Sequence, residues 1–189
     1  MVEMEKGVLA LAVLVFAAVL LAGCLSGNFS KEADKLNLID AKYGVDAENM
    51  TPASIVQLDA FEGELIELKA KEEGNWLSAD AKALAELISI RLELTAMQRK
   101  FLEAQKITSK ISVRSPDCTE GGLVERAKNA LDSAASSASL ALEKKNIFAQ
   151  NHSGIAAEAL AKFEGLDELA QGINESVSDT EAQLDGLCG

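Results

Sequence analysis

Apolar side chains recur every three or four residues, without a slip, for four heptads between residues 83 and 111. The series reads Ala83, Leu87, Ile90, Leu94, Met97, Phe101, Ala104, Thr108 and Ile111. This spacing places them on one face of a single long helix, and such a face has to be buried against other helices. Ser78 is a suitable N-cap for this helix, and Ser115-Pro116-Asp117 ends it. The sequence therefore predicts a domain built around one long amphipathic helix.

Four further helices are predicted from spacing and end signals. A short one covers 31–43, and a second has Thr51 as N-cap and Pro52 at its first position, with Gly74 as its stop. Another runs over about 120–150, with a seam of mostly small residues that permits close helix approach. That seam is Val124, Ala127, Leu131, Ala134, Ala138, Ala141, Lys145 and Phe148. The last helix follows the turn at 151–153 and keeps heptad register to Leu187, with Gly172 as the point at which it could break.

These elements define the predicted fold class. Ala, Leu, Glu and Lys dominate, prolines number 2 and aromatics make up 4%, which is typical of long helices rather than sheets. We expect an all-α, antiparallel bundle of long helices with coiled-coil-like heptad packing and one short N-terminal helix. A solenoid of separate helices is not favoured, because no 34-residue repeat recurs.

The N-terminus has the organisation of an export signal. An apolar run from Val8 to Ala22 is within the usual range for a signal peptide and short for a membrane span. It ends in Leu21-Ala22-Gly23-Cys24, which resembles the lipobox of prokaryotic lipoproteins. The resemblance covers the leader only, and it implies cleavage before Cys24 and lipid attachment to that thiol. The alternative is an uncleaved signal anchor, which would leave the domain on the same side of the membrane.

The resemblance implies a division of the chain and a location. Residues 1–23 would be a signal peptide, residues 24–50 a lipidated Cys24 with a tether and a short helix, and residues 51–189 the helical bundle. The domain would face the extracytoplasmic side of the cell membrane. Stable anchoring needs two or more acyl chains, as the lipoprotein class provides.

With Cys24 lipidated, Cys118 and Cys188 remain as a pair in an oxidising space. Suppose that the last two helices form a hairpin. They have about 31 and 34 residues, so at 1.5 Å per residue their lengths are nearly equal, and Cys188 returns to the start of the preceding helix. We therefore expect a Cys118–Cys188 disulfide. Two free thiols are the alternative, and a redox or metal site lacks both a CxxC motif and further ligands.

Charge supplies a second test of the architecture. Basic residues gather toward the end of the third helix, and acidic residues dominate after Glu158. In an up-down bundle those two helices run parallel, so Lys106, Lys110 and Arg114 would lie near the acidic end of the last helix. That end carries Glu175, Asp179, Glu181 and Asp185, which oppose the helix dipole. The alternative is two independently solvated faces.

Four asparagines stand in N-x-S/T sequons: Asn28, Asn49, Asn151 and Asn174. They indicate possible N-glycosylation of an exported surface protein. We expect Asn49 and Asn151 just before helix starts and Asn174 within a helix. The alternative is that these asparagines are solvated caps and loops without glycans.

Motifs for catalysis and cofactors are not found in the sequence. The only histidine is His152, expected in an exposed turn, so zincin and ferritin-like sites are excluded in their usual forms, and no GxSxG, P-loop or GxGxxG occurs. We expect no enzyme, no metal and no cofactor, and the net charge of −12 argues against nucleic acid.

The function predicted is that of a non-catalytic, membrane-anchored envelope lipoprotein. Its helices would act as a scaffold or protein-interaction module, through a protein partner or through self-association. The alternative is a helical bundle that binds an apolar or small ligand between its helices.

Overall fold

The computed structural model describes residues 29–46, 49–52, 54–75 and 77–189. The described helices are residues 29–42, α2 (Ile55–Glu73), α3 (Ala79–Thr108), α4 (Leu123–Asn151), α5 (Ala156–Ala159) and α6 (Leu166–Cys188), with a 3-10 turn η1 (Ala161–Phe163). No strand occurs in these ranges. The predicted all-α bundle is confirmed.

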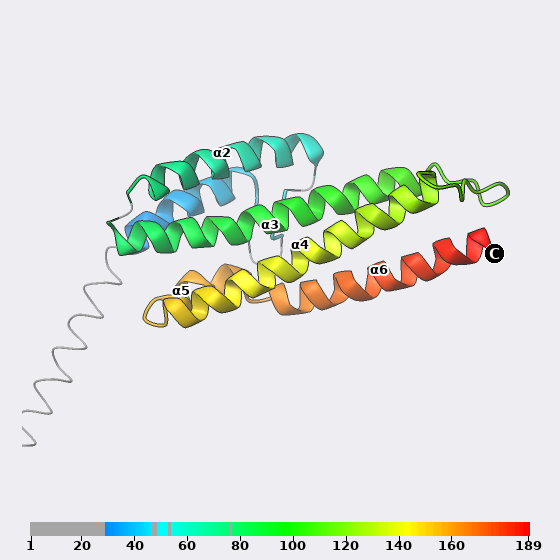
Figure 1. The fold of residues 1–189 in the computed structure, drawn as a ribbon. Helices are drawn as coiled ribbons and strands as arrows, with labels where there is room; N and C mark the ends of the chain where they lie inside the picture. Colours follow the sequence, from blue (N-terminus) through cyan, green and yellow to red (C-terminus); the bar gives the residue numbers. More distant parts are fainter. Residues whose placement is uncertain (1–28, 47–48, 53, 76) are drawn as a thin grey trace, which may run out of the picture.

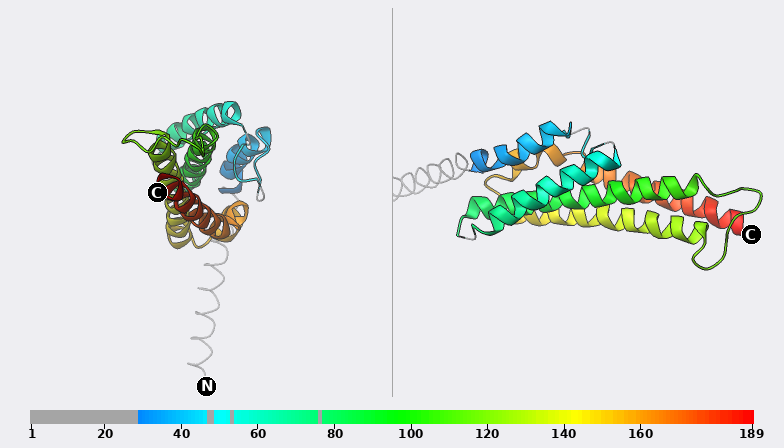
Figure 2. Two further views of the ribbon diagram at one scale, coloured as in Figure 1. Left: turned by 90° about the vertical axis from the view of Figure 1, so that its right-hand side faces the viewer. Right: turned by 90° about the horizontal axis from the view of Figure 1, so that it is seen from above.

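A long antiparallel hairpin of α3 and α4 forms the spine of the molecule (Figure 1). We call the end with the α2–α3 and α4–α5 connections the proximal end, and the end with residues 109–122 and the C-terminus the distal end. Helix 29–42, α2, α5 and η1 pack on the proximal half, and α6 runs along α4 toward the distal end (Figures 1 and 2).

The seam predicted for α3 is buried through most of its length, from Ala83 through Met97 and again at Ala104. The small residues of α4 face it, and Ala134, Ala138 and Ala141 are completely buried. Because alanine adds little beyond Cβ, the two helices can approach closely along this contact. The bulk of the core comes from leucine and isoleucine on α3 and from the buried Phe61, Phe148 and Phe163.

The predicted N-cap of α3 is confirmed, whereas that of α2 is wrong. Ser78 caps α3 as expected, its hydroxyl accepting from the Ala81 amide at 3.2 Å. For α2 the predicted cap Thr51 is wrong: Ser54 is the N-cap, and its hydroxyl accepts from the Gln57 amide at 3.3 Å. The carbonyl of Met50, just before Thr51, accepts a hydrogen bond from Arg91, which ties residues 49–52 to the side of α3 instead of making them the start of α2.

The predicted continuous last helix is also wrong. The chain forms α5, then η1, and only then α6 from Leu166, whereas the expected break point Gly172 lies inside α6. The break turns Phe163 inward, where its ring is almost completely buried under the guanidinium of Arg91. A Cβ on Gly165 would lie 3.4 Å from Met50 Cε, so the break also lets the chain pass close to residues 49–52.

Helix 29–42, which the predicted division placed before the bundle as a short helix after the tether, contributes to the main core. Phe29 and Leu36 are buried in the same apolar cluster as α2, α3 and α4. A smaller cluster fills the distal half between α3, α4 and α6. No helix among the described residues is long and apolar enough to cross a membrane.

We predict that Ala138→Leu destabilises the fold by about 1–3 kcal/mol, because the added bulk cannot enter the close α3–α4 contact without shifting a helix. Chemical denaturation monitored by circular dichroism measures the change. Ser136→Leu is the matched control on the exposed face of α4 and is expected to stay within about 0.5 kcal/mol of the parent. Equal effects at the two positions would contradict a tight alanine seam.

Candidate functional site

A buried ion pair joins helix 29–42 to α3. Arg91 and Asp40 are both fully buried, and Arg91 Nη2 donates to Asp40 Oδ2 at 3.0 Å. Arg91 Nη1 donates to the Met50 carbonyl at 3.2 Å, and the guanidinium lies 4.4 Å from the centroid of the Phe163 ring. Lys162 Nζ approaches the same Asp40 oxygen at 3.3 Å. Four separate stretches of chain thus meet at one guanidinium.

The Arg91 guanidinium and the Asp40 carboxylate share one hydrogen bond, not the two of a bidentate pair. Asp40 Oδ1 and Arg91 Nε have no hydrogen-bond partner among the described residues. These are the two atoms that a side-on carboxylate–guanidinium pair would join. Burial lowers the pKa of Arg91, and the attraction of Asp40 opposes that shift. The Met50 carbonyl, the Phe163 ring and Lys162 therefore contribute to compensating the two buried charges.

Beside the ion pair lies a cavity of about 200 Å³. Phe29, Leu36, Leu87 and Phe163 line its apolar side, and Asp40 and Lys162 lie at its polar side. The volume is below the roughly 300–1,000 Å³ typical of pockets for drug-sized ligands. The cavity can accommodate only a small molecule.

The ion pair was not predicted from the sequence. A signal was present, because Arg91 lies four residues after Leu87 and three before Leu94 on the apolar face. A charge at the centre of such a stripe indicates a buried partner. The sequence contained no comparable sign that the partner would be Asp40.

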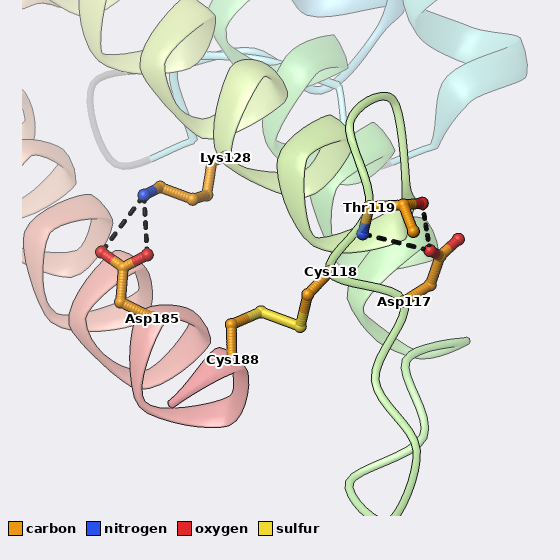
Figure 3. Close-up of a disulfide and its surroundings, with 6 residues drawn as sticks. All are labelled: Asp117, Cys118, Thr119, Lys128, Asp185 and Cys188. Atoms are coloured by element: carbon orange, nitrogen blue, oxygen red, sulfur yellow. Dashed lines mark hydrogen bonds and ion pairs between the residues drawn. A yellow bond between two sulfur atoms is a disulfide. The ribbon is translucent and has the colours of Figure 1, made fainter.

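The predicted disulfide is present between Cys118 and Cys188, with a Cα–Cα distance of 5.8 Å (Figure 3). It fastens the end of α6 to the chain just before α4. Gly121, with φ +73°, and Gly122, whose Cβ would lie 2.7 Å from the Asp117 carbonyl oxygen, make the tight return into α4. Asp117 Oδ1 accepts from the Thr119 hydroxyl at 2.6 Å, and this bond lowers the pKa of Asp117.

The predicted charge pairing between the third and last helices is wrong. Asp185 pairs with Lys128 of α4 at 2.9 Å (Figure 3). Asp167 pairs with Lys145 of α4. The reason is that α6 packs along α4, which presents its own lysines. Lys106 of α3 and Lys110 of the connection that follows it are exposed, and neither forms an ion pair with another described residue.

The modification sites predicted from sequence are only partly within the described residues. The lipobox Leu21–Cys24 and the first sequon, Asn28, lie outside them. Asn49, Asn151 and Asn174 are exposed. Asn151 is the last residue of α4 rather than the start of a helix, and Asn174 lies within α6.

His152 is not the freely exposed turn residue that we expected. It follows the last turn of α4, its side chain is 20% exposed, and its Nε2 lies 3.1 Å from Glu86 Oε2. Its ring packs on Phe148 with centroids 4.6 Å apart. Across the part of the chain that the structure describes, no three or more His, Cys, Asp or Glu side chains gather closely enough to hold a metal ion.

Comparison with protein-family models, with curated proteins and with solved structures finds no match to this chain.

We predict that Arg91→Met destabilises the protein by about 3–5 kcal/mol, since it leaves the Asp40 carboxylate buried without its main partner. Denaturant unfolding measures the loss. Adding Asp40→Leu to Arg91→Met should recover most of it, because the lone buried charge is then removed.

The matched control is Arg99→Met, on the same helix. Arg99 bridges Asp59 and Glu62 of α2 at a side-chain exposure of 32%. Exposed pairs contribute little, so this change should cost less than about 1 kcal/mol. A similar cost for both arginines would show that the buried pair does not hold the proximal half together.

We predict that replacing Cys118 and Cys188 by serine lowers the stability by up to about 4 kcal/mol, the chain-entropy value for a loop of this length. The bond spans a sequence separation of 70. Amide hydrogen exchange should rise in the distal turns of α6 and stay unchanged in α2. Asp185→Asn, which removes only the adjacent ion pair, should leave exchange in α6 nearly unaffected. Uniform acceleration across the chain would contradict a local role.

Proposed function

We propose that the protein is a non-catalytic, membrane-anchored envelope lipoprotein whose helical bundle serves as a scaffold or protein-interaction module. The leader with Leu21-Ala22-Gly23-Cys24 supports the anchor and the extracytoplasmic location. The observation that carries the interaction role is the distal end of the α3–α4 hairpin, where a long connection carries unpaired basic residues.

The connection between α3 and α4 covers residues 109–122. Helix–helix connections in bundles usually have about 2–8 residues, and longer ones often have a function. Val113, near its tip, is 76% exposed, and Arg114 beside it is exposed as well. An apolar side chain flanked by basic residues suits contact with an acidic protein surface.

The anchor and this connection would lie at opposite ends of the molecule. Phe29 is five residues after Cys24, and five residues span at most about 18 Å. Helix 29–42 lies in the proximal half, and α3 extends from the proximal end for 30 residues, or about 45 Å (Figure 1). A lipid on Cys24 would therefore hold the proximal half near the membrane and display the distal end away from it.

The alternative function is the binding of a small ligand between helices. The cavity of about 200 Å³ beside Asp40 favours it. We rank ligand binding second for two reasons. The cavity is small, and the Arg91 guanidinium already donates to Asp40 and to the Met50 carbonyl, so it is not available to a ligand.

The test uses the full chain in its own membranes with a photo-crosslinking amino acid at position 113. We expect a discrete cross-linked protein product from this position, because the distal end would be the contact surface. Cys24→Ser should move the chain out of the membrane fraction and reduce the yield, since tethering raises the local concentration of the partners.

The matched control places the same amino acid at Leu77, which is 78% exposed at the proximal end. Equal products from positions 77 and 113 would indicate non-specific capture. No product from position 113, together with retention of the Cys24→Ser chain in the membrane, would overturn both halves of the proposal.

A further inference from the structure

Basic residues without an ion pair gather at the distal end. Seven Lys and Arg side chains form no ion pair with a carboxylate among the described residues: Lys31, Lys71, Lys82, Lys106, Lys110, Arg114 and Arg126. The last four lie at the end of α3, in the connection that follows and in the first turn of α4. All four are exposed. We call them the basic end.

An acidic counterpart lies on the outer face of α6. Glu168, Glu175 and Asp179 are separated by seven and four residues, which puts them on one side of the helix. That side is opposite the one that buries Ala170, Val177 and Leu184. All three carboxylates are exposed, and none has an ion pair within the described ranges. We call them the acidic stripe.

The fold keeps these two surfaces of one molecule apart. The disulfide holds the end of α6 beside the start of α4, and the inner acidic residues Asp167 and Asp185 are bound by lysines of α4. The acidic stripe consequently faces away from the bundle. The basic residues of α3 and the connection are separated from it by α4, which packs between α3 and α6 and carries Arg126 itself.

The distal end of the acidic stripe, at Asp179, nevertheless lies near the level of the basic end along the bundle, whereas Glu168 lies about 16 Å farther toward the proximal end. On α3, Ile107 shares a shallow groove with Arg126 and Ala130 of α4, while Asp185 of α6 contacts Lys128. Asp179 lies six residues before Asp185, or about 9 Å along the helix. Two extended side chains can bridge an offset of this size.

We propose that the basic end of one copy binds the acidic stripe of a second copy in the same membrane. This inference rests on the proposed function, because tethered copies share one orientation and bring the basic end and the distal end of the acidic stripe to similar heights. The order along the chain is compatible as well: Lys106, near the end of α3, and Lys110, just beyond that end, are four residues apart, as are Glu175 and Asp179 on α6. Tethering also compensates for the repulsion between two acidic chains by raising their local concentration.

The first experiment uses full chains labelled with light or heavy nitrogen and mixed in phosphatidylcholine vesicles, whose headgroups carry no net charge. A carbodiimide then joins lysine amines directly to carboxylates that they contact. We expect peptides that join Lys106 or Lys110 of one label to Glu175 or Asp179 of the other. Cross-linked peptides of uniform label only would overturn the proposal.

Charge reversal supplies the second experiment. One variant carries Lys106→Glu, Lys110→Glu and Arg114→Glu, and the other carries Glu168→Lys, Glu175→Lys and Asp179→Lys. Each variant alone should lose mixed-label cross-links and two-tag co-purification by about tenfold, because its contacts become repulsive. Mixing the two variants should restore co-purification, because every contact is again between opposite charges. Failure of the mixture to recover would contradict the pairing.

The matched control reverses the unpaired lysines of the proximal half, Lys31→Glu, Lys71→Glu and Lys82→Glu. It makes the same change in net charge and should leave mixed-label products at positions 106, 110, 175 and 179 unchanged. Loss of association in this control would indicate a general charge effect and overturn the proposal.

The photo-crosslinking at position 113 separates failure of this inference from failure of the proposed function. A product with twice the mass of the chain supports both. A product with a different protein, in the absence of mixed-label peptides, overturns self-association and leaves the interaction role in place. No product of either kind overturns both.

Discussion

The close contact between α3 and α4 determines where every other element can lie. Ala134, Ala138 and Ala141 let the two helices approach along the middle of the molecule, and the bulky side chains of α3 therefore project to either side of this contact. Each side then needs its own cover. Helix 29–42 and α2 supply it in the proximal half, and α6 supplies it in the distal half.

The two halves are covered to different extents and by different means. The proximal half has the large apolar cluster and a buried ion pair that connects helix 29–42, residues 49–52 and η1 to Arg91. A buried pair of this kind is costly to desolvate, and its clearest effect is to specify which segments meet. The distal half has a smaller cluster, and there a covalent bond holds the last helix. The distal end is consequently the part of the bundle that fewer helices cover.

The sequence predicted the patterns that recur along a single helix. It did not predict which helix a given side chain would contact. The 4-3 series identified α3 and α4, and equal helix lengths placed Cys188 beside Cys118. The break before α6 was misplaced, because Phe163 fits the heptad series and its role over Arg91 depends on a helix more than 70 residues away. The partner of Asp185 was wrong for a related reason. Lys106 of α3 and Lys128 of α4 are equally basic, and only the packing of α6 on α4 selects between them.

The acidic residues in the last turns of α6 are unfavourable for the helix that carries them. The last turns contain no basic residue, so Glu181 and Asp185 lie near the negative end of the helix dipole. Burial raises the pKa of Glu181, and the nearby Asp132 adds to that shift, which means that its charge is locally disfavoured. Lys128 and the Cys118–Cys188 bond offset this cost at the same end of the helix. Helix stability therefore accounts for Asp167 and Glu168 in the first turn of α6, where they favour the dipole, but gives no reason for the acidic residues of its last turns.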